Sequence, residues 1–567
     1  MMITVVLSAN MKRMLKDSIL VKKLVGIETA GSMNILFTDK TGTLTTGRLS
    51  VDRVITPKGS FSTIGAIKKQ GAVFDNLLIC AKHNTDTVVS GEKISGGNAT
   101  DRAISEFFIN EPTPALRIAD KQSFTSFNKY SSVTSTDGMT YYKGAAERIL
   151  GCCKYVFSDT GEKVAYDFSG IYAEYRRATE NGERVLAIAV SDKDSDEMSF
   201  VALIVLKDKL RGGVRESVKE LMSAGIQIVM LTGDGMETAV AIAEEAGIFR
   251  RSSGHIAISS ESLANMPDED IREILPLIRV VSRALPSDKV RLVRISQSMN
   301  LVVGMTGDGI NDAPSLKLAD VGFVMGSGTE IAKSAGDIVI LDDSVNAISK
   351  TVLYGRTIFN SIRKFITFQL IMNLAACGIS LVGQFIGVET PITITQMLWI
   401  NIIMDTLGGL AFATEPPLPY YMKEQPKRRD EPLLTRNMVK GIFALGGYTL
   451  LLSVLFLRLP AFRAAFGAEY GSERFLTAFY ALFVFMGIFN CFLSRSDRLN
   501  FLSNISKNST FVAVMTLIAI VQVFMIYAGG TVFRTVPIPW TDLINVLLLA
   551  FTTIVFELIR RIFVKLK

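Results

Sequence analysis

Apolar residues are distributed unevenly along this chain. Beyond about Asn360, long apolar stretches with few charges follow one another, and each has roughly the 20 residues that a helix needs to cross a bilayer. They predict six membrane-spanning helices, at residues 365–388, 392–414, 438–459, 475–493, 511–530 and 543–563. Before Asn360, charged residues are frequent and apolar runs are short. A soluble first part is therefore expected to precede a membrane part.

In the soluble part, short β-rich apolar runs end abruptly in Gly/Asp turns. Three of these runs lie at residues 34–38, 227–231 and 301–305, and stretches with a helical pattern, such as 238–246, follow. This alternation predicts an α/β fold with a parallel sheet. Ligands of such sheets bind beyond the carboxyl ends of the strands. Residues 49–199 separate the first strand from the others, so we interpret them as an inserted domain.

The chain opens with a short apolar run that is followed by Lys12 and Arg13. This run is too short to cross a bilayer by itself. A secretory signal peptide has its charges before the apolar core, whereas here the order is reversed. We therefore interpret residues 1–14 as the end of a membrane helix whose beginning lies outside this sequence.

The composition agrees with a membrane protein and argues against two other classes. A hydrophobic share of 49% and a mean hydropathy of +0.32 are too high for an ordinary soluble enzyme. The net charge of +7 does not come from clustered basic and aromatic residues, so no nucleic-acid partner is expected. Basic residues instead gather at 423–436, 495–498 and 560–567, between or after predicted spans. By the positive-inside rule these segments and the soluble part are cytoplasmic.

Three strand ends carry acidic or hydroxyl groups in glycine turns. The motifs are DKTGTLT from Asp39, TGD from Thr232 and TGDGIND from Thr306. Glycines let backbone N–H groups approach phosphate oxygens, and carboxylates supply the oxygen ligands that Mg²⁺ prefers. A single TGD would more often be an ordinary turn, but the three motifs at strand ends together predict a site for phosphate and Mg²⁺.

These motifs resemble those of the P-type ATPases, which belong to the haloacid dehalogenase-like phosphotransferases, and the resemblance covers nearly the whole chain. It implies that Asp39 attacks the γ-phosphate of ATP and becomes an aspartyl-phosphate. Mg²⁺ would bind Asp39, Asp308 and the carbonyl of Thr41. The other catalytic residues implied are Thr232 and Gly233, which would hold phosphoryl oxygens, Lys289, which would neutralise developing charge, and Asp312.

Position 41 distinguishes a pump from a phosphatase. Phosphatases of the same superfamily usually carry a second Asp two residues after the nucleophile as a general acid and base, and this chain has Thr41 there. A hydroxyl is a poor proton shuttle at neutral pH. The phosphorylated aspartate is therefore expected to persist, as a transport cycle requires.

The inserted domain carries four stretches similar to those with which P-type ATPases bind ATP, namely GNATD at 97–101, FTSFNK at 124–129, KGAAE at 143–147 and GERVLA at 182–187. By this resemblance Phe124 stacks on adenine, Lys143 lines the pocket and Arg184 reaches the phosphates. The implied nucleotide-binding residues are Asp101, Phe124, Lys129, Lys143, Arg184, Asp208, Arg211, Asp234, Arg283 and Asn311. Two usual prolines are replaced, by Lys209 and Ala146, which changes turn rigidity rather than chemistry.

Polar residues inside membrane helices are costly, which makes Asn373, Asn401 and Asp405 candidates for function. Hydrogen bonding between helices is the alternative, and it suits Asn better than Asp. Oxygen ligands without sulfur or imidazole favour a hard cation such as Ca²⁺. The surrounding stretches look like plasma-membrane-type calcium ATPases, which implies that the three residues bind one transported Ca²⁺. A pump for Mn²⁺, H⁺, Na⁺ or K⁺ stays open as an alternative.

Pattern and resemblance together predict an α/β haloacid dehalogenase-like phosphorylation domain with an inserted α+β nucleotide-binding domain, followed by an all-α transmembrane helical bundle. The phosphorylation domain is expected at 15–48 and 200–345, the inserted domain at 49–199, and the bundle of an integral, multi-pass cell-membrane protein at 346–567.

The sequence contains neither the TGES nor the PEGLP motif of P-type ATPases, and no counterpart of their first three membrane helices. In that family PEGLP supplies calcium ligands, and the TGES glutamate positions the water that cleaves the aspartyl-phosphate. We therefore expect an incomplete pump, either truncated or complemented by a separate N-terminal portion. The alternative from a different class is a non-transporting remnant that binds nucleotide.

Overall fold

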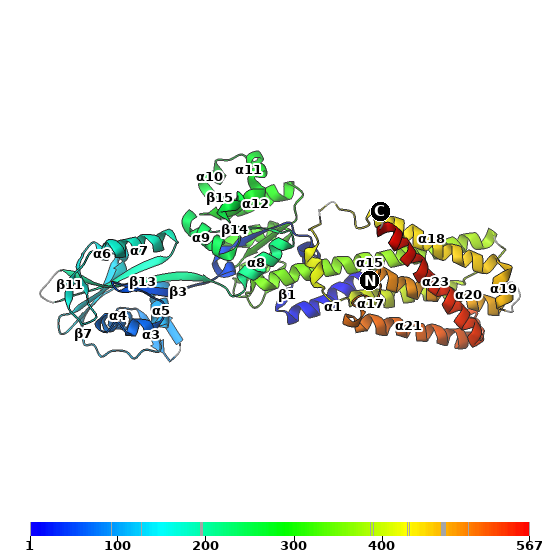
Figure 1. Ribbon diagram of the computed structural model, residues 1–567, viewed down its shortest axis with the longest axis horizontal. Helices are drawn as coiled ribbons and strands as arrows, with labels where there is room; N and C mark the ends of the chain where they lie inside the picture. Colours follow the sequence, from blue (N-terminus) through cyan, green and yellow to red (C-terminus); the bar gives the residue numbers. More distant parts are fainter. Residues whose placement is uncertain are drawn as a thin grey trace.

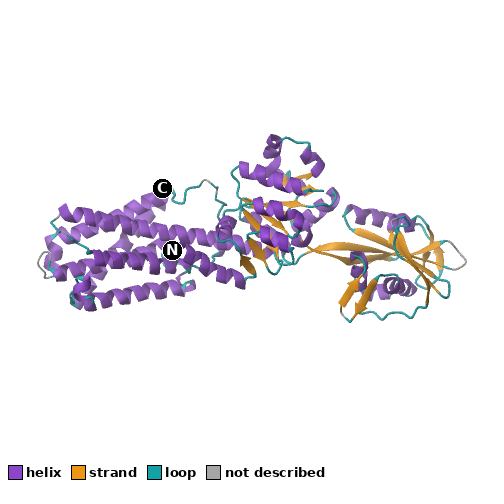
Figure 2. Cartoon of the chain, turned by 180° about the vertical axis from the view of Figure 1, so that it is seen from behind, coloured by secondary structure: helices purple, strands orange, loops and turns teal. Residues whose placement is uncertain are grey.

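The protein is elongated, with three parts in a row (Figure 1). This computed structural model describes residues 2–91, 93–125, 127–192, 197–385, 387–388, 390–427, 429, 431–466, 472–496 and 498–565, without the side chains of residues 2, 3, 5, 404, 405 and 565. The inserted part lies at one end, an α/β part lies in the middle, and a helical bundle lies at the other end (Figure 2). The predicted fold class is confirmed in this arrangement.

The middle part is built on an eight-stranded sheet with the order β1-β19-β18-β17-β2-β14-β16-β15. All neighbouring strands are parallel except β1 and β19. The strands are β1 (Ile19–Val21), β2 (Ile35–Asp39), β14 (Gln227–Leu231), β15 (Ile256–Ser259), β16 (Ile278–Ser282), β17 (Val303–Gly307), β18 (Val321–Met325) and β19 (Ile338–Ile340). The three predicted strands are confirmed as β2, β14 and β17, although β17 begins two residues later than expected.

Helices cover both faces of this sheet because its strands carry apolar side chains on both sides. In β2, Ile35 and Phe37 are buried in one core and Leu36 in the other. One face packs against α2 (Val25–Gly31), α8 (Val214–Ser223) and α9 (Met236–Ala246). The other face packs against α10 (Ser260–Ala264), α11 (Asp268–Ile274), α12 (Pro286–Ser298), α13 (Ala313–Leu318) and α14 (Glu330–Ala335).

A second, nine-stranded sheet forms the inserted part. It contains β3 (Thr45–Thr56), β4 (Gly59–Phe61), β7 (Ile118–Gln122), β8 (Tyr130–Ser135), β9 (Thr140–Ala145), β10 (Cys153–Phe157), β11 (Lys163–Ala165), β12 (Arg184–Ser191) and β13 (Met198–Leu210). A separate hairpin is formed by β5 (Thr87–Ser90) and β6 (Lys93–Gly96). The helices α3 (Ile64–Lys68), α4 (Ala72–His83) and α5 (Ala99–Phe107) lie on one face, and α6 (Ala146–Leu150) and α7 (Ser169–Glu180) lie on the other.

The long strands β3 and β13 join the two sheets. The two strands pair antiparallel, and their pairing runs from Ile55 opposite Leu203 to Thr45 opposite Leu210. It therefore extends beyond residues 49–199 toward the middle part. This two-stranded ribbon is the visible link between the inserted and middle parts (Figure 2).

Six helices among the described residues are long and apolar enough to cross a membrane, which confirms the six predicted spans. They are α15 (Val345–Phe385), the run Ile394–Ala413 with α16 (Ile394–Ile402) and α17 (Gly409–Ala413), α18 (Arg436–Arg458), α20 (Glu473–Arg495), α21 (Ser509–Ala528) and α23 (Trp540–Lys565). Shorter helices are α1 (Met2–Lys16), α19 (Pro460–Ala465) and α22 (Gly530–Phe533). Helix α15 begins 20 residues before the predicted span because the charged stretch ahead of Phe365 is also helical.

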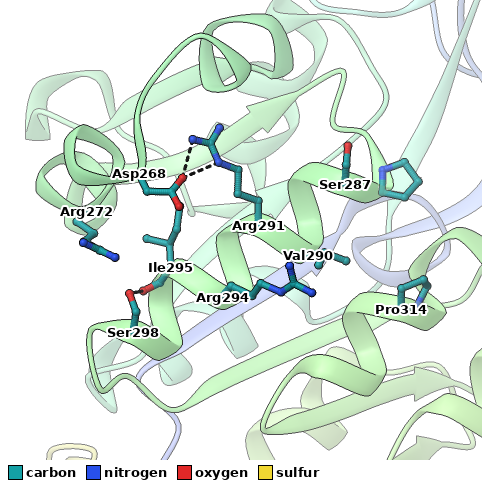
Figure 3. Close-up of a pocket in the computed structure, with 10 residues that line it drawn as sticks. Asp268, Arg272, Ser287, Val290, Arg291, Arg294, Ile295, Ser298 and Pro314 are labelled. Carbon is teal, nitrogen blue, oxygen red and sulfur yellow. Dashed lines mark hydrogen bonds and ion pairs between the residues drawn. The ribbon is translucent and has the colours of Figure 1, made fainter.

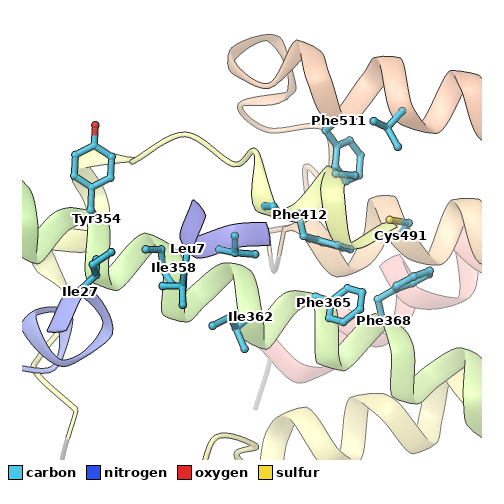
Figure 4. Close-up of a cluster of buried hydrophobic side chains, with 14 of the residues drawn as sticks. Leu7, Ile27, Tyr354, Ile358, Ile362, Phe365, Phe368, Phe412, Cys491 and Phe511 are labelled. Carbon is cyan, nitrogen blue, oxygen red and sulfur yellow. The ribbon is translucent and has the colours of Figure 1, made fainter. Parts of the chain in front are cut away.

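An apolar cluster holds the bundle together where α1, α15, α17 and α21 meet (Figure 4). The ring of Phe412 in α17 lies 6.3 Å from that of Phe365 and 6.0 Å from that of Phe368, both in α15. The ring of Phe511 in α21 lies 5.9 Å from Phe412 on another side. Buried aromatic groups of this size contribute strongly to packing, so these contacts fix the helices relative to one another.

Helix α15 also attaches the bundle to the middle part. A Cβ built at Gly355 would lie 2.3 Å from the carbonyl oxygen of Ile27 and 2.5 Å from the nitrogen of Gly31, so only glycine permits this approach of α15 to α2. The next residue, Arg356, is buried and donates hydrogen bonds to the backbone carbonyls of Gly31, Ala224, Tyr421 and Glu424. Helix α15 is therefore joined to the middle part at the ends of α2 and α8.

Candidate functional site

Three neighbouring strands deliver the predicted motifs to one edge of the middle sheet. Asp39 ends β2, Thr232 follows β14, and Asp308 follows β17. Strand β2 lies between the other two and is parallel to both. Their carboxyl ends therefore meet, and the motif residues come together at the place where α/β sheets bind ligands.

The side chain of Lys289 joins two of the motifs. It reaches the site from the first turn of α12, and its Nζ lies 2.8 Å from Oδ1 of Asp39 and 2.6 Å from Oδ1 of Asp312. Lys289 is only 7% exposed, and burial alone would lower its pKa, but the two carboxylates outweigh this effect and raise it. The ammonium therefore stays charged beside the predicted nucleophile.

Burial is the main influence on Asp39. It raises the pKa of this carboxyl to about 6, against the opposing effect of Lys289, and the charges of Asp312 and Asp308 raise it further. Burial, followed by the charge of Asp312, likewise raises the pKa of Asp308. Carboxylates that repel one another in a partly desolvated site are arranged to receive a cation.

The glycine turns leave room for small ligands beside these carboxylates. A Cβ at Gly42, whose φ is +73°, would lie 2.0 Å from Oδ2 of Asp308, so the turn after Asp39 lies directly against that carboxylate. At Gly233 a Cβ would meet no atom within 4 Å, which leaves open space beside the backbone. No three His, Cys, Asp or Glu side chains among the described residues form a metal site by themselves. The residues present thus fit Mg²⁺ held by Asp39, Asp308 and the carbonyl of Thr41, with phosphate or water as further ligands.

Two threonines position the backbone of Asp39. Its N–H donates a 3.1 Å hydrogen bond to Oγ1 of Thr306, which in turn lies 3.0 Å from Oγ1 of Thr38. In the neighbouring motif, Oγ1 of Thr232 accepts a 3.1 Å hydrogen bond from the N–H of Asp234. These bonds tie the ends of β2 and β17 together and shape the turn after β14.

Sequence reasoning assigned no role to Lys40, which directly follows Asp39. The structure places its buried Nζ 2.7 Å from Oδ2 of Asp234 and 3.7 Å from Oδ2 of Asp208. Lys40 therefore links the turn after Asp39 to Asp208 and Asp234, two residues predicted to bind nucleotide. Its position in the DKTGT motif was the available signal.

Several residues predicted to bind nucleotide lie at the base of the two-stranded ribbon. Asp208 accepts hydrogen bonds of 2.7 Å from Oγ1 of Thr45 and 3.0 Å from the N–H of Gly47. Arg211 donates to the carbonyls of Thr45, at 3.0 Å, and of Gly42, at 2.8 Å. Both side chains therefore hold the turn after Asp39 against the ribbon.

The remaining two predicted residues near this edge, Arg283 and Asn311, have exposed side chains. Arg283 has a φ of +51°, and its backbone N–H donates a 2.9 Å hydrogen bond to the carbonyl of Asp234. Thr41, whose carbonyl was predicted to bind Mg²⁺, has an exposed side chain as well. The side chains of all three are therefore open to solvent at this edge of the sheet.

A cleft of about 460 Å³ in the inserted part gathers four of the predicted nucleotide-binding residues, Asp101, Phe124, Lys143 and Arg184. The ring of Phe124 is 56% exposed, as a ring that stacks on a base must be. Lys143 is buried with its Nζ 2.6 Å from Oδ1 of Asp101. Lys129 does not line the cleft. Its Nζ lies 3.9 Å from a carboxylate oxygen of Glu147, which does line the cleft.

Two protein families match this chain. Residues 33–320 match the family described as haloacid dehalogenase-like hydrolase, and residues 389–563 match the family described as cation transporting ATPase, C-terminus. The chain belongs to the cation-transporting ATPases of the haloacid dehalogenase-like family.

Its relatives include plasma-membrane-type pumps of plants. This chain is 34% identical over 575 residues to "Probable calcium-transporting ATPase 6, plasma membrane-type" of Oryza sativa subsp. japonica. The matched region covers 94% of the chain and 56% of that relative. It is 36% identical over 572 residues to "Putative calcium-transporting ATPase 11, plasma membrane-type" of Arabidopsis thaliana. Here the matched region covers 95% of the chain and 55% of the relative. The chain thus spans a little over half the length of these relatives.

The three residues predicted to bind the transported ion lie in the first two membrane spans of the ATPase chain. The side chains of Asn373 and Asn401 are exposed, and the side chain of Asp405 lies outside the described residues. A small pocket between the neighbouring helices is lined by apolar groups such as Phe368, Met372 and Ile403. The described side chains therefore do not enclose an ion by themselves.

A further pocket of about 610 Å³ lies on the middle part of the ATPase chain, beside α11, α12 and α13 (Figure 3). Arg291 pairs there with Asp268 at 2.6 Å, and Arg294 lies beside it on the surface. Among the described residues that line it, none belongs to the three motifs, and Pro314 lies two positions after the last motif residue, Asp312. This pocket is separate from the site at Asp39.

Proposed function

We propose that this chain performs ATP-driven cation transport, with Ca²⁺ as the ion, through an aspartyl-phosphate at Asp39. The observation that carries the proposal is the position of Asp39 at the carboxyl end of the central strand, with the ammonium of Lys289 at 2.8 Å. The six membrane helices are joined to the part of the chain that contains Asp39, so phosphorylation of Asp39 could change their arrangement.

In the proposed reaction, one carboxylate oxygen of Asp39 attacks the γ-phosphorus of ATP. The new P–O bond forms as the bond from the γ-phosphorus to the β-phosphate oxygen breaks, and ADP leaves. Lys289 and the backbone N–H groups around Gly233 neutralise charge that develops on the phosphoryl oxygens. Asp312 holds Lys289 in place at 2.6 Å. Asp39 and Asp308 would hold Mg²⁺, which would supply further positive charge beside the phosphoryl group.

The inserted part presents the nucleotide. In this proposal Phe124 stacks on adenine, while Lys143 and Arg184 bind polar groups of ATP across the cleft. The ribbon of β3 and β13 serves as the hinge that brings the γ-phosphate to Asp39. The hydrogen bonds of Asp208 and Arg211 to the base of this ribbon support that role, because they couple its position to the turn that follows the nucleophile.

Two features support transport over simple hydrolysis. Thr41 offers no carboxyl group to activate water, so the aspartyl-phosphate persists. The Gly355 contact and two hydrogen bonds of Arg356, to the carbonyls of Gly31 and Ala224, connect the middle part to α15, which carries Asn373. With the basic segments on the inner side, the catalytic part is cytoplasmic.

We propose Ca²⁺ as the ion because its ligands, Asn373, Asn401 and Asp405, are oxygen donors and because the relatives are named calcium-transporting ATPases. The sequence contains neither TGES nor PEGLP, and we propose that a separate N-terminal pump portion supplies their functions.

The decisive experiment is phosphorylation with γ-³²P-ATP and Mg²⁺. The purified chain should form an acid-stable, hydroxylamine-labile phosphoprotein, as an acyl phosphate does, and Asp39→Asn should abolish the label. Asp270→Asn, which changes an exposed carboxylate on α11, is the matched control and should label normally. Labelling that survives Asp39→Asn would exclude the proposed nucleophile.

A further inference from the structure

One short turn of the inserted part lies against the middle part of the protein. It comprises residues 181–183 and connects α7 to β12. A Cβ built at Gly182 would lie 2.3 Å from Oγ1 of Thr238 and 2.5 Å from its Cα, so the turn packs directly on the first turn of α9. Figure 1 shows α7 and α9 next to each other, at the facing ends of the two parts. We call the contact of residues 181–183 with Thr238 the α9 contact.

Glycine determines the shape of this turn. Gly182 has a φ of +72°, in the left-handed region that favours glycine. Its N–H donates a 2.9 Å hydrogen bond to the carbonyl of Thr179, and the N–H of Glu183 donates a 3.0 Å bond to the carbonyl of Ala178. This pair of bonds is the Schellman arrangement with which helices end at a glycine. The backbone at position 182 is therefore held in one conformation, and only glycine leaves room for Thr238.

A buried ion pair holds the turn to the ribbon of β3 and β13. Nη1 and Nη2 of Arg53 in β3 lie 2.9 Å and 2.6 Å from the two carboxylate oxygens of Glu183. The side chain of Glu183 is only 7% exposed, and a bidentate pair of this kind fixes direction as well as distance. Arg53 lies opposite Val205 in β13, which lies opposite Val185 in β12. The ion pair thus reaches across β13 and ties the turn to β3.

The ribbon contacts the same helix at a second point. Nζ of Lys207 in β13 lies 2.5 Å from a carboxylate oxygen of Glu245, near the end of α9. Thr238 and Glu245 are about two helical turns apart along α9. Two separate points of contact restrict rotation about the ribbon more than one point does. An exposed ion pair contributes little by itself, so the packed contact at Gly182 is the stronger of the two.

Both sides of the α9 contact lead directly to groups of the proposed reaction. Arg184, which lines the nucleotide cleft, is the next residue after the turn. On the other side, α9 follows the turn that contains Thr232 and Asp234. Asp234 lies 2.7 Å from Nζ of Lys40, the residue after the nucleophile. A shift at the α9 contact would therefore move the cleft relative to Asp39.

We infer that Arg53 and Glu183 are positioning residues, which hold Gly182 on Thr238 and thereby fix the place of the nucleotide cleft relative to Asp39. Neither Arg53 nor Glu183 lines the cleft. Their effect on the reaction rests on the proposed function, whereas their effect on the position of the inserted part does not. The two effects are therefore measured separately.

The first measurement is the distance between the two parts in the whole chain, in detergent micelles without nucleotide. Spin labels are attached after Asp137→Cys in the inserted part and Ser298→Cys in the middle part, both at exposed positions. The native cysteines that are not buried are first removed by Cys152→Ser and Cys377→Ser. Electron–electron double resonance should then give one narrow distance distribution.

Gly182→Ala should shift or broaden this distribution, because the added methyl group meets Thr238. Gly254→Ala is the matched control. Gly254 has a φ of +67°, so alanine is similarly strained there, but its Cβ would meet no atom within 4 Å. Arg53→Gln should broaden the distribution as well, since it releases the turn. The exchange Arg53→Glu with Glu183→Arg should re-form the ion pair and restore the narrow distribution.

The second measurement is the rate of phosphoprotein formation at saturating ATP, together with the affinity for ATP. Gly182→Ala and Arg53→Gln should each lower the rate about tenfold or more, since a misplacement of about 1 Å can cost about 10²-fold. Their affinity for ATP should stay within about twofold, because binding and reaction are separate quantities and neither residue lines the cleft. The exchange variant should recover the rate. Lys154→Gln, which breaks an exposed ion pair on the inserted part, should change neither value.

Thermal unfolding shows which variants are folded, and if either Gly182→Ala or Arg53→Gln is not, the other one decides. An unchanged distance distribution in these variants, an equal change in Gly254→Ala, or a folded exchange variant without recovery would overturn the inference. A changed distance with an unchanged rate would show that the α9 contact does not position the cleft for the reaction. If even the unchanged protein forms no phosphoprotein, the proposed function fails, and the distance measurement still decides whether Arg53 and Glu183 position the inserted part.

Discussion

Lys289 donates a 2.8 Å hydrogen bond to Asp39, although 250 residues separate the two along the chain. The intervening residues include the whole inserted part and three strands of the middle sheet, β14, β15 and β16. Because α12 follows β16, its first turn lies beside the carboxyl ends of β2 and β14. A cation from one segment thus meets a buried carboxylate from another, and the reaction proposed for Asp39 depends on this meeting.

Replacement of Lys289 by Gln should slow formation of the phosphoprotein by about 10²- to 10³-fold, the effect typical for loss of one group that stabilises developing charge. The reason is that Asp39 and Asp312 would then face each other without the cation between them. Rapid-quench labelling with γ-³²P-ATP measures the rate. A rate within twofold of the unchanged protein would show that Lys289 only fills space.

Replacement of Asp308 by Ala should suppress phosphorylation and leave ATP binding nearly unchanged. Asp308 lies against Gly42 in the turn after the nucleophile, far along the chain from the cleft that contains Phe124. Its loss removes a proposed Mg²⁺ ligand, but no contact of the cleft. Titration with a fluorescent ATP analogue, run beside the labelling assay, separates the two effects. Weakened nucleotide binding in this variant would contradict the division of roles.

Replacement of Phe124 by Ala should have the reverse effect and weaken ATP binding by about 1 to 3 kcal/mol, as for a base stacked on an aromatic side chain. Phe127 provides a matched control because it is 96% exposed, close in sequence, and not among the residues that line the cleft. Phe127→Ala should bind ATP normally. Similar affinities for both variants and the unchanged protein would exclude stacking by Phe124.

Vesicles that contain only the 567-residue polypeptide should accumulate no Ca²⁺, and its aspartyl-phosphate should decay slowly. Thr41 cannot activate water efficiently, and the sequence holds no TGES glutamate. Co-expression with an N-terminal portion that carries TGES and PEGLP should restore turnover and uptake. With Asp405→Asn the rescue should fail, since that change removes a carboxylate from the proposed ion path. Uptake by the polypeptide alone would show that the added portion is dispensable.

Local patterns in the sequence were sufficient for the motifs and the membrane spans. An apolar β-rich run that ends in a glycine turn predicts a strand wherever it occurs, and β2 and β14 lie within one residue of their predicted limits. A long apolar stretch predicts a span for the same reason, because burial in lipid is a property of the stretch itself. The length of α15 was missed, since its charged first half continues the helix outside the membrane part.

The neighbours of each side chain depended on the tertiary structure. Strand order places Asp39 between the motifs that contain Thr232 and Asp308, and no periodicity in the chain specifies that order. The pairing of buried Lys40 with Asp234 joins residues from separate elements in the same way. An apolar pattern acts over a few residues, whereas these contacts depend on how whole elements pack. The sequence by itself therefore determined which groups are chemically able to react. The fold decided which of these groups lie in contact.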